Sequence, residues 1–136
     1  MDLANAESFP QTSGELITQL AGGANLVDGG QTWQHADLHK DNLEVMLRCC
    51  DAELETMERT RLVAAPFYFE RAAILYRKLK DFDREVELCE RYITAIQDYY
   101  RTVAQAHEAD VRRGPQFQAI KSRLVKARKL LFARAR

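Results

Sequence analysis

The sequence predicts an all-α protein, and three observations support that class. Its 136 residues include only three prolines and six glycines, and no glycine occurs between Gln31 and Arg113. Hairpin-rich β-proteins need glycine, asparagine and proline in many turns. Apolar residues also recur at spacings of three and four over long stretches, as on one face of a helix. We therefore expect a helical domain over 41–136, preceded over 1–40 by a flexible or loop-rich segment.

The N-terminal segment contains the signals for one short helix. Thr12 and Glu15 stand at the spacing of a capping box, and Leu16, Ile17 and Leu20 follow on one side. The pair at 22–23 is Gly-Gly, which ends a helix. The turn-rich stretch that follows predicts a loop.

Four longer helices are expected near 42–63, 66–80, 83–112 and 115–133. Asp41 with Glu44 forms a second capping-box pattern, while Pro66 and Pro115 suit the first turns of two helices. The third helix has an unbroken apolar stripe at alternating spacings of three and four: Val86, Cys89, Ile93, Ile96, Tyr100, Val103 and His107. Short connections favour an antiparallel four-helix bundle or a short solenoid.

The segment from Pro66 to Ile93 resembles a single tetratricopeptide repeat. The first helix has the family's aromatic residue, pair of small residues and tyrosine, which are Phe69, Ala72, Ala73 and Tyr76. An aromatic residue, Phe82, follows the turn, and the second helix has the packing residues Cys89 and Tyr92. Glu85 departs from the pattern, which prefers alanine there, and the second helix is longer than the family's. The resemblance implies a protein-binding face on the first helix, formed by Phe67, Glu70, Ile74, Arg77 and Lys78.

Charge is distributed unevenly along a chain whose formal net charge is zero. Residues 1–60 contain 11 acidic and 3 basic residues, whereas residues 112–136 contain 9 basic residues and no acidic one. One interpretation is a nucleic-acid contact through the last helix, formed by Lys121, Arg123, Lys126, Arg128 and Lys129. The other is docking of this basic helix on acidic ones, within the chain or across a dimer, through the edge charges Asp51, Glu53, Glu58, Glu85 and Glu90.

The sequence offers no set of residues for catalysis, and we expect no enzyme activity, cofactor or metal. His35 and His39 are four apart but lack the other ligands of a recognisable metal motif. Cys49, Cys50 and Cys89 lie in apolar helical patterns, which suits reduced, buried thiols. No signal peptide or membrane span is apparent, so a cytoplasmic location is expected.

These patterns predict a non-enzymatic protein–protein interaction module, such as an adaptor, regulator or inhibitor in a bacterial or phage setting. Tyr99 lies off the main apolar seams and is a candidate anchor for a partner. The length of the third helix favours a homodimer through its stripe. The alternative is a nucleic-acid-binding regulator that uses the basic C-terminal helix.

Overall fold

The computed structural model of the chain describes residues 13–103 and 110–135. It contains the α-helices α2 (Ser13–Leu20), α3 (Thr32–Leu38), α4 (Leu43–Thr60), α5 (Phe67–Lys78), α6 (Phe82–Thr102) and α7 (Pro115–Arg134). A 3-10 helix, η1 (Val111–Arg113), precedes α7. The two strands β1 (Leu26–Val27) and β2 (Gly30–Gln31) form a short antiparallel hairpin. The all-α class is therefore confirmed.

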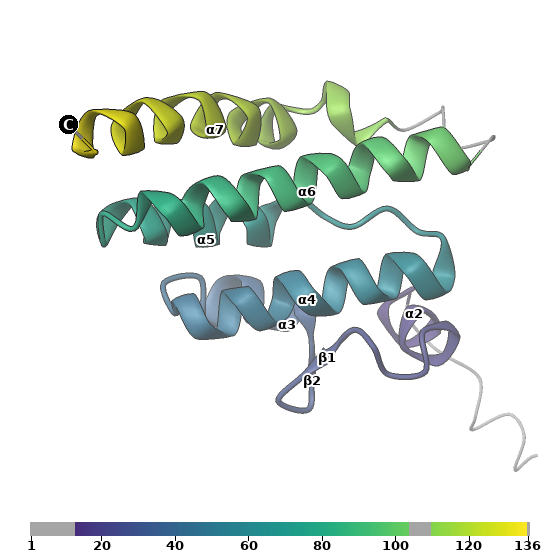
Figure 1. Cartoon of the computed structure of the whole chain (residues 1–136). Helices are drawn as coiled ribbons and strands as arrows, with labels where there is room; N and C mark the ends of the chain where they lie inside the picture. The colour runs from purple at the N-terminus through teal and green to yellow at the C-terminus, as the bar shows by residue number, and fades with distance from the viewer. Residues whose placement is uncertain (1–12, 104–109, 136) are drawn as a thin grey trace, which may run out of the picture.

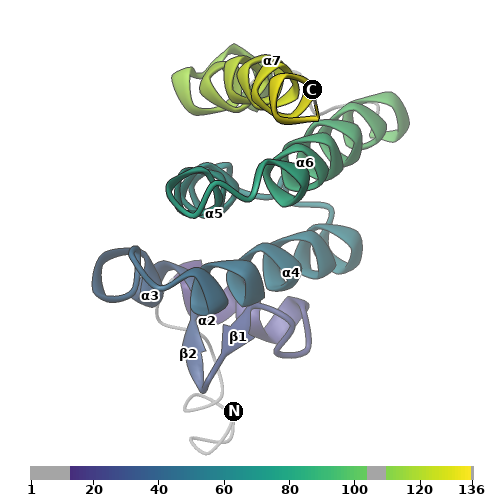
Figure 2. The ribbon, with the colours of Figure 1, turned by 60° about the vertical axis from the view of Figure 1, so that its left-hand side comes forward.

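The four long helices run alternately in opposite directions, and α7 lies at one end of the stack (Figure 1). Helix α5 packs against both α4 and α6, and α6 packs against α7. In the turned view, α4 and α6 lie on one side of the molecule and α5 lies on the other (Figure 2). Helix α5 therefore supports α4 and α6 from behind.

The N-terminal region lies on the side of α4 away from α7 (Figures 1 and 2). It differs from the prediction of a single short helix before residue 41, because α3 and the hairpin follow α2. His35 of α3 is buried and bonds the backbone oxygen of Val27 through Nε2 at 2.6 Å. The Thr32 hydroxyl donates to Glu53 of α4 at 3.2 Å. These bonds join α3 to the hairpin and to α4.

Two helix boundaries differ from the sequence prediction in an informative way. Asn42, rather than Asp41, caps α4 by accepting the Val45 backbone N–H at 3.1 Å, while Asp41 pairs with Arg71 of α5 at 2.6 Å. Helix α4 ends at Thr60 because Arg61 takes a left-handed conformation, with φ of 62°.

Helix α6 ends at Thr102, ten residues before the predicted limit. Val103 takes an extended conformation, with φ of −104° and ψ of 97°, and its N–H donates to the backbone oxygen of Tyr99. The hydroxyl of Tyr100 then accepts the Val111 backbone N–H at 2.8 Å, and the Arg112 guanidinium lies 4.3 Å from the Tyr100 ring centroid. These contacts bring η1 back onto α6. His107 of the predicted stripe lies outside the described residues.

The core is formed by residues that the four helices direct toward one another. Phe69 of α5 stacks on Tyr92 of α6 with ring centroids 4.4 Å apart, and Tyr92 also faces Phe117 of α7. All three cysteines are free and buried. Burial raises the pKa of Cys49 to about 11 and that of Cys89 to about 12. Their thiols therefore stay protonated near neutral pH.

The sequence predicted Glu85 to be an edge charge on the long helix, but the structure places it in the interior. Its side chain is completely buried. Arg77 of α5 donates to Glu85 through Nε at 2.9 Å, and Arg123 of α7 donates at 3.3 Å. Arg77 also donates to the backbone oxygen of Arg123 at 3.1 Å. The carboxylate thus joins three helices where a repeat of the resembled family would have alanine.

Candidate protein-docking groove

A groove runs between α4 and α6, on the face opposite α5. Both helices turn a row of side chains toward it at alternating spacings of four and three. The row on α4 is Leu47, Asp51, Leu54 and Glu58, with Arg61 directly after the helix end, and the row on α6 is Arg84, Leu88, Arg91, Ala95, Asp98 and Thr102. At 1.5 Å per residue, the row on α6 is about 27 Å long.

The larger hollow of this groove lies near the C-terminal ends of α4 and α6 and has a volume of about 400 Å³. Leu54, Met57 and Ala95 supply its apolar surface, and Tyr99 adds a ring. The Tyr99 hydroxyl donates to the backbone oxygen of Arg61 at 2.8 Å, which fixes that ring at the end of the groove. Charged and polar side chains form the rim: Glu58, Arg61, Asp98 and Thr102.

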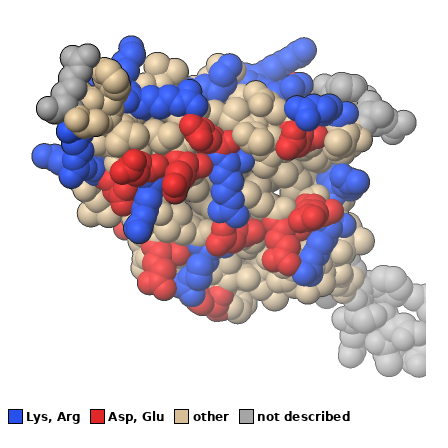
Figure 3. All heavy atoms as spheres, viewed as in Figure 1, with Lys and Arg blue, Asp and Glu red and all other residues tan. Residues whose placement is uncertain are grey.

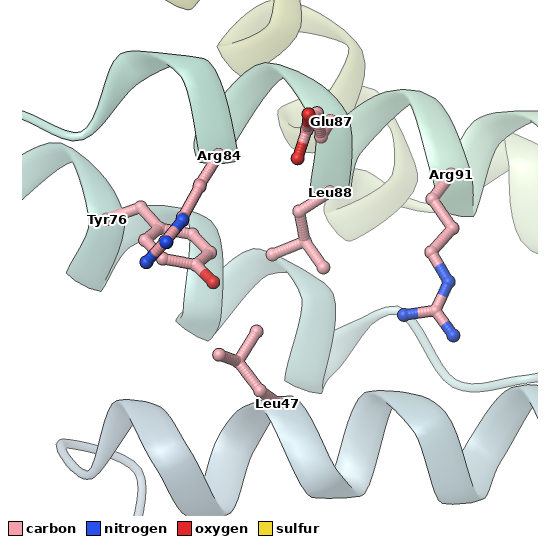
Figure 4. Close-up of a pocket in the computed structure, with 6 residues that line it drawn as sticks. All are labelled: Leu47, Tyr76, Arg84, Glu87, Leu88 and Arg91. Carbon is pink, nitrogen blue, oxygen red and sulfur yellow. The ribbon is translucent and has the colours of Figure 1, made fainter.

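The smaller hollow lies nearer the start of both helices and has a volume of about 220 Å³. Leu88 of α6 and Leu47 of α4 point toward each other across it, and Tyr76 of α5 lies to one side of them (Figure 4). Arg84 and Arg91 extend from α6 toward α4 in the same view. This hollow therefore has apolar lining residues between two arginines, and Glu87 also lines it.

One ion pair crosses the groove between the two hollows. Arg91 of α6 and Asp51 of α4 approach to 2.7 Å, and about half of each side chain is exposed. Acidic and basic side chains alternate over this face of the molecule, whereas Lys and Arg gather along the α7 edge (Figure 3). The groove is therefore amphipathic and has both signs of charge on its rim.

The residues that the repeat resemblance assigned to partner binding lie mostly outside this groove. Phe67 and Ile74 are half-buried on α5, and the Phe67 ring packs edge-on against Tyr68 with centroids 5.4 Å apart. Arg77 is held by Glu85, while Lys78 is exposed. Glu70 is half-buried, and its buried Oε2 has no hydrogen-bond partner within the described part of the chain. Among the six predicted residues, Tyr99 lines the groove.

The five basic residues singled out on α7 fall into two groups. Arg123 binds Glu85, and Arg128 binds Glu90 of α6 at 2.8 Å, so both contribute to docking of α7 on α6. This pairing within the chain was one of the two interpretations of the basic helix. Lys121, Lys126 and Lys129 are exposed and form no ion pair with any residue the structure describes.

The groove contains residues that the sequence assigned wholly to the core. Leu47, Leu54 and Met57 belong to the apolar seam expected on the first long helix, and the sequence does not distinguish the core side of that seam from its groove side. The available signal was the second row on the same helix, where charged residues alternate with these leucines: Asp51, Glu58 and Arg61. Partial burial of Leu47 and Leu54 marks them as the exposed margin of the seam.

Comparisons with known proteins leave the site to be interpreted from its own geometry. No protein-family model, curated protein or solved structure matches the chain. Across residues 13–103 and 110–135, no helix is long and apolar enough to span a membrane. The same residues contain no group of three or more His, Cys, Asp or Glu side chains placed to hold a metal ion.

Proposed function

We propose that the chain is a protein–protein interaction module that binds an amphipathic α-helix of another protein in the groove between α4 and α6. The observation that supports this most directly is the pair of parallel rows of side chains, which repeat at the helical spacing over about 27 Å. A third helix laid along two neighbouring helices meets such rows with its own residues at i, i+3, i+4 and i+7.

The chemistry of the groove specifies the bound helix further. Leu54, Met57 and Ala95 favour apolar side chains along the centre of the bound helix. Glu58 and Asp98 stand on opposite rims of the larger hollow, and Arg61 lies at its end. The bound helix would therefore have basic residues beside its apolar stripe and an acidic residue facing Arg61. The partner is therefore a protein that contains such a helix, and the chain acts on it as an adaptor, regulator or inhibitor.

The repeat resemblance of Pro66–Ile93 supports the same class of role, since α6 is the second helix of that hairpin. The face used differs from the one that the resemblance implies. On α5, Arg77 is held by Glu85, and Phe67 is half-buried beside Tyr68. The groove has two hollows with apolar lining residues, so we assign binding to it.

Photo-crosslinking from two adjacent positions of α6 tests this proposal. Asp98 lines the groove, while Gln97 is also exposed but lies about 100° away around the helix. With p-benzoylphenylalanine in place of Asp98, we expect crosslinking in the native host to one discrete protein. The crosslinked segment should have apolar residues at helical spacing. The variant with the same group at Gln97 should give no such product.

A synthetic peptide of the crosslinked segment then provides the quantitative measurement. Leu54→Glu should raise its dissociation constant at least about 30-fold, because a charge replaces an apolar contact at the centre of the hollow. Gln97→Glu should leave the dissociation constant unchanged. Circular dichroism melting of both variants checks that the fold is intact. Equal crosslinking from both positions, or none from Asp98, would contradict the proposal.

A further inference from the structure

The two ends of the helical stack have opposite charge. Residues 13–60, which form α2, the hairpin, α3 and α4, contain nine acidic and three basic residues. Residues 110–135, which form η1 and α7, contain one acidic and eight basic residues. Helix α7 lies at one end of the stack, α2 and the hairpin lie at the other, and α3 lies beside α4 (Figures 1 and 2). The molecule is therefore electrically polar along its stacking direction.

The basic end also exposes large apolar side chains. Val125 and Phe132 of α7 are 53% and 62% exposed. They lie on the outward side of the helix together with Lys121 and Lys129, because steps of four, four and three residues keep these positions within a quarter-turn of one another. Helix α7 thus covers α6 with one side and presents a cationic, partly apolar stripe with the other.

The acidic end has the complementary surface. Trp33 and Leu38 of α3 are 61% and 79% exposed. Asp37 stands one turn from Trp33, and Glu44 follows in the first turn of α4. Both carboxylates are exposed, and neither forms an ion pair within the described part of the chain. Trp33 and Asp37 therefore share one exposed side of α3, while Leu38 lies about 140° from Trp33 around the helix.

We propose that these two ends bind each other between copies of the chain, so that the basic α7 face of one molecule docks on the acidic α3 face of the next. Exposed apolar surface at both ends supplies contact area, and opposite charge supplies orientation. The two faces belong to different helices and are different surfaces, so this contact is heterologous, and each pair of molecules retains one free face of each kind. The expected product is a concentration-dependent head-to-tail oligomer.

The predicted homodimer through the long helix uses a different surface. Its stripe residues Cys89, Ile96 and Tyr100 are buried within the chain. The ends, by contrast, leave Trp33 and Phe132 mostly exposed. Self-association through the ends is independent of the proposed groove, so Leu54→Glu should leave it unchanged.

Charge-reversal variants test this inference by sedimentation velocity at low salt. The wild-type chain should exceed its monomer mass of 15.6 kDa as its concentration rises, and added salt should reverse this increase. Variant A, Lys121→Glu with Lys129→Glu, and variant B, Asp37→Lys with Glu44→Lys, should each raise the dissociation constant at least about tenfold. Lys78→Glu with Arg101→Glu changes the net charge as much as variant A and should have no such effect.

Mixing the two variants gives the decisive result. Variant A has an acidic α7 face, and variant B has a basic α3 face, so each can bind the other, and their unaltered ends can still pair. An equimolar mixture should therefore regain the mass that each variant alone has lost. The inference is overturned if the wild type stays monomeric at high micromolar concentration, or if mixing restores nothing. It is also overturned if the face formed by Lys121 and Lys129 binds a 20-base-pair DNA duplex at 150 mM salt and does not bind a second copy of the chain.

Discussion

At the residue scale, Glu85 is a completely buried carboxylate that two arginines hold. Removing a carboxylate from water is costly unless charged donors replace its hydration, and Arg77 and Arg123 supply three contacts between 2.8 and 3.3 Å. Each arginine comes from a different helix and keeps about a quarter of its side chain exposed. The carboxylate therefore holds α5 and α7 in register against α6.

Glu85→Ala should reduce the free energy of unfolding by about 3 kcal/mol, because it leaves two partly buried guanidinium groups without their anion. The matched control is Glu90→Ala, which breaks the exposed pair with Arg128 and should cost less than about 1 kcal/mol. Urea unfolding at neutral pH measures both values. Equal costs for the two variants would show that Glu85 contributes no more than a surface ion pair.

At the element scale, the connection over 61–66 between α4 and α5 is held by side chains of the neighbouring helices. The Tyr92 hydroxyl donates to the backbone oxygen of Ala64 at 2.8 Å, and Tyr99 donates to that of Arg61 at the same distance. Glu53 accepts the Ala65 N–H at 3.3 Å, and burial raises the pKa of its carboxyl. Three backbone groups of this irregular segment thus bond side chains in place of secondary-structure partners.

The two tyrosines form a matched pair for a test of this element. Tyr92→Phe should cost about 1 to 2 kcal/mol, because it leaves the buried oxygen of Ala64 without a donor. Tyr99→Phe removes a hydrogen bond that water can replace, so it should cost less than about 0.5 kcal/mol. Thermal unfolding of the two variants checks the order. A larger loss for Tyr99→Phe would contradict this account of the connection.

At the scale of the whole molecule, burial is concentrated in α4 to α7, and the N-terminal elements contribute less. Leu16 and Leu20 of α2 are exposed, and α2 is joined to α4 in part by the hydrogen bond from Arg59 to the backbone oxygen of Ala21 at 2.8 Å. Native-state hydrogen exchange should therefore show α2 opening at a lower free energy than α6 and α7, which should open together. Equal protection of α2 and α6 amides, measured by mass spectrometry, would contradict this expectation.

The sequence by itself determined the all-α class and the approximate positions of the four long helices. It did so because apolar spacing, capping residues and the absence of glycine act locally, through neighbours three or four positions apart. Pairing of the basic helix with acidic ones was also foreseeable, since Arg123 and Arg128 stand beside an apolar seam. Boundaries were less predictable: α6 ends ten residues before the predicted limit, and Tyr100 near that end binds Val111 of η1, a contact that apolar spacing does not reveal.

Only the tertiary structure decided which side of each seam faces the core and which remains accessible. The burial of Glu85 required Arg77 and Arg123 to converge from helices that are distant in sequence. The groove required α5 to support α4 and α6 from behind, so that one seam has both buried residues, such as Cys50, and half-buried ones, such as Leu47 and Leu54. Spacing along a helix specifies a face, but the neighbours that cover that face are set by packing between helices.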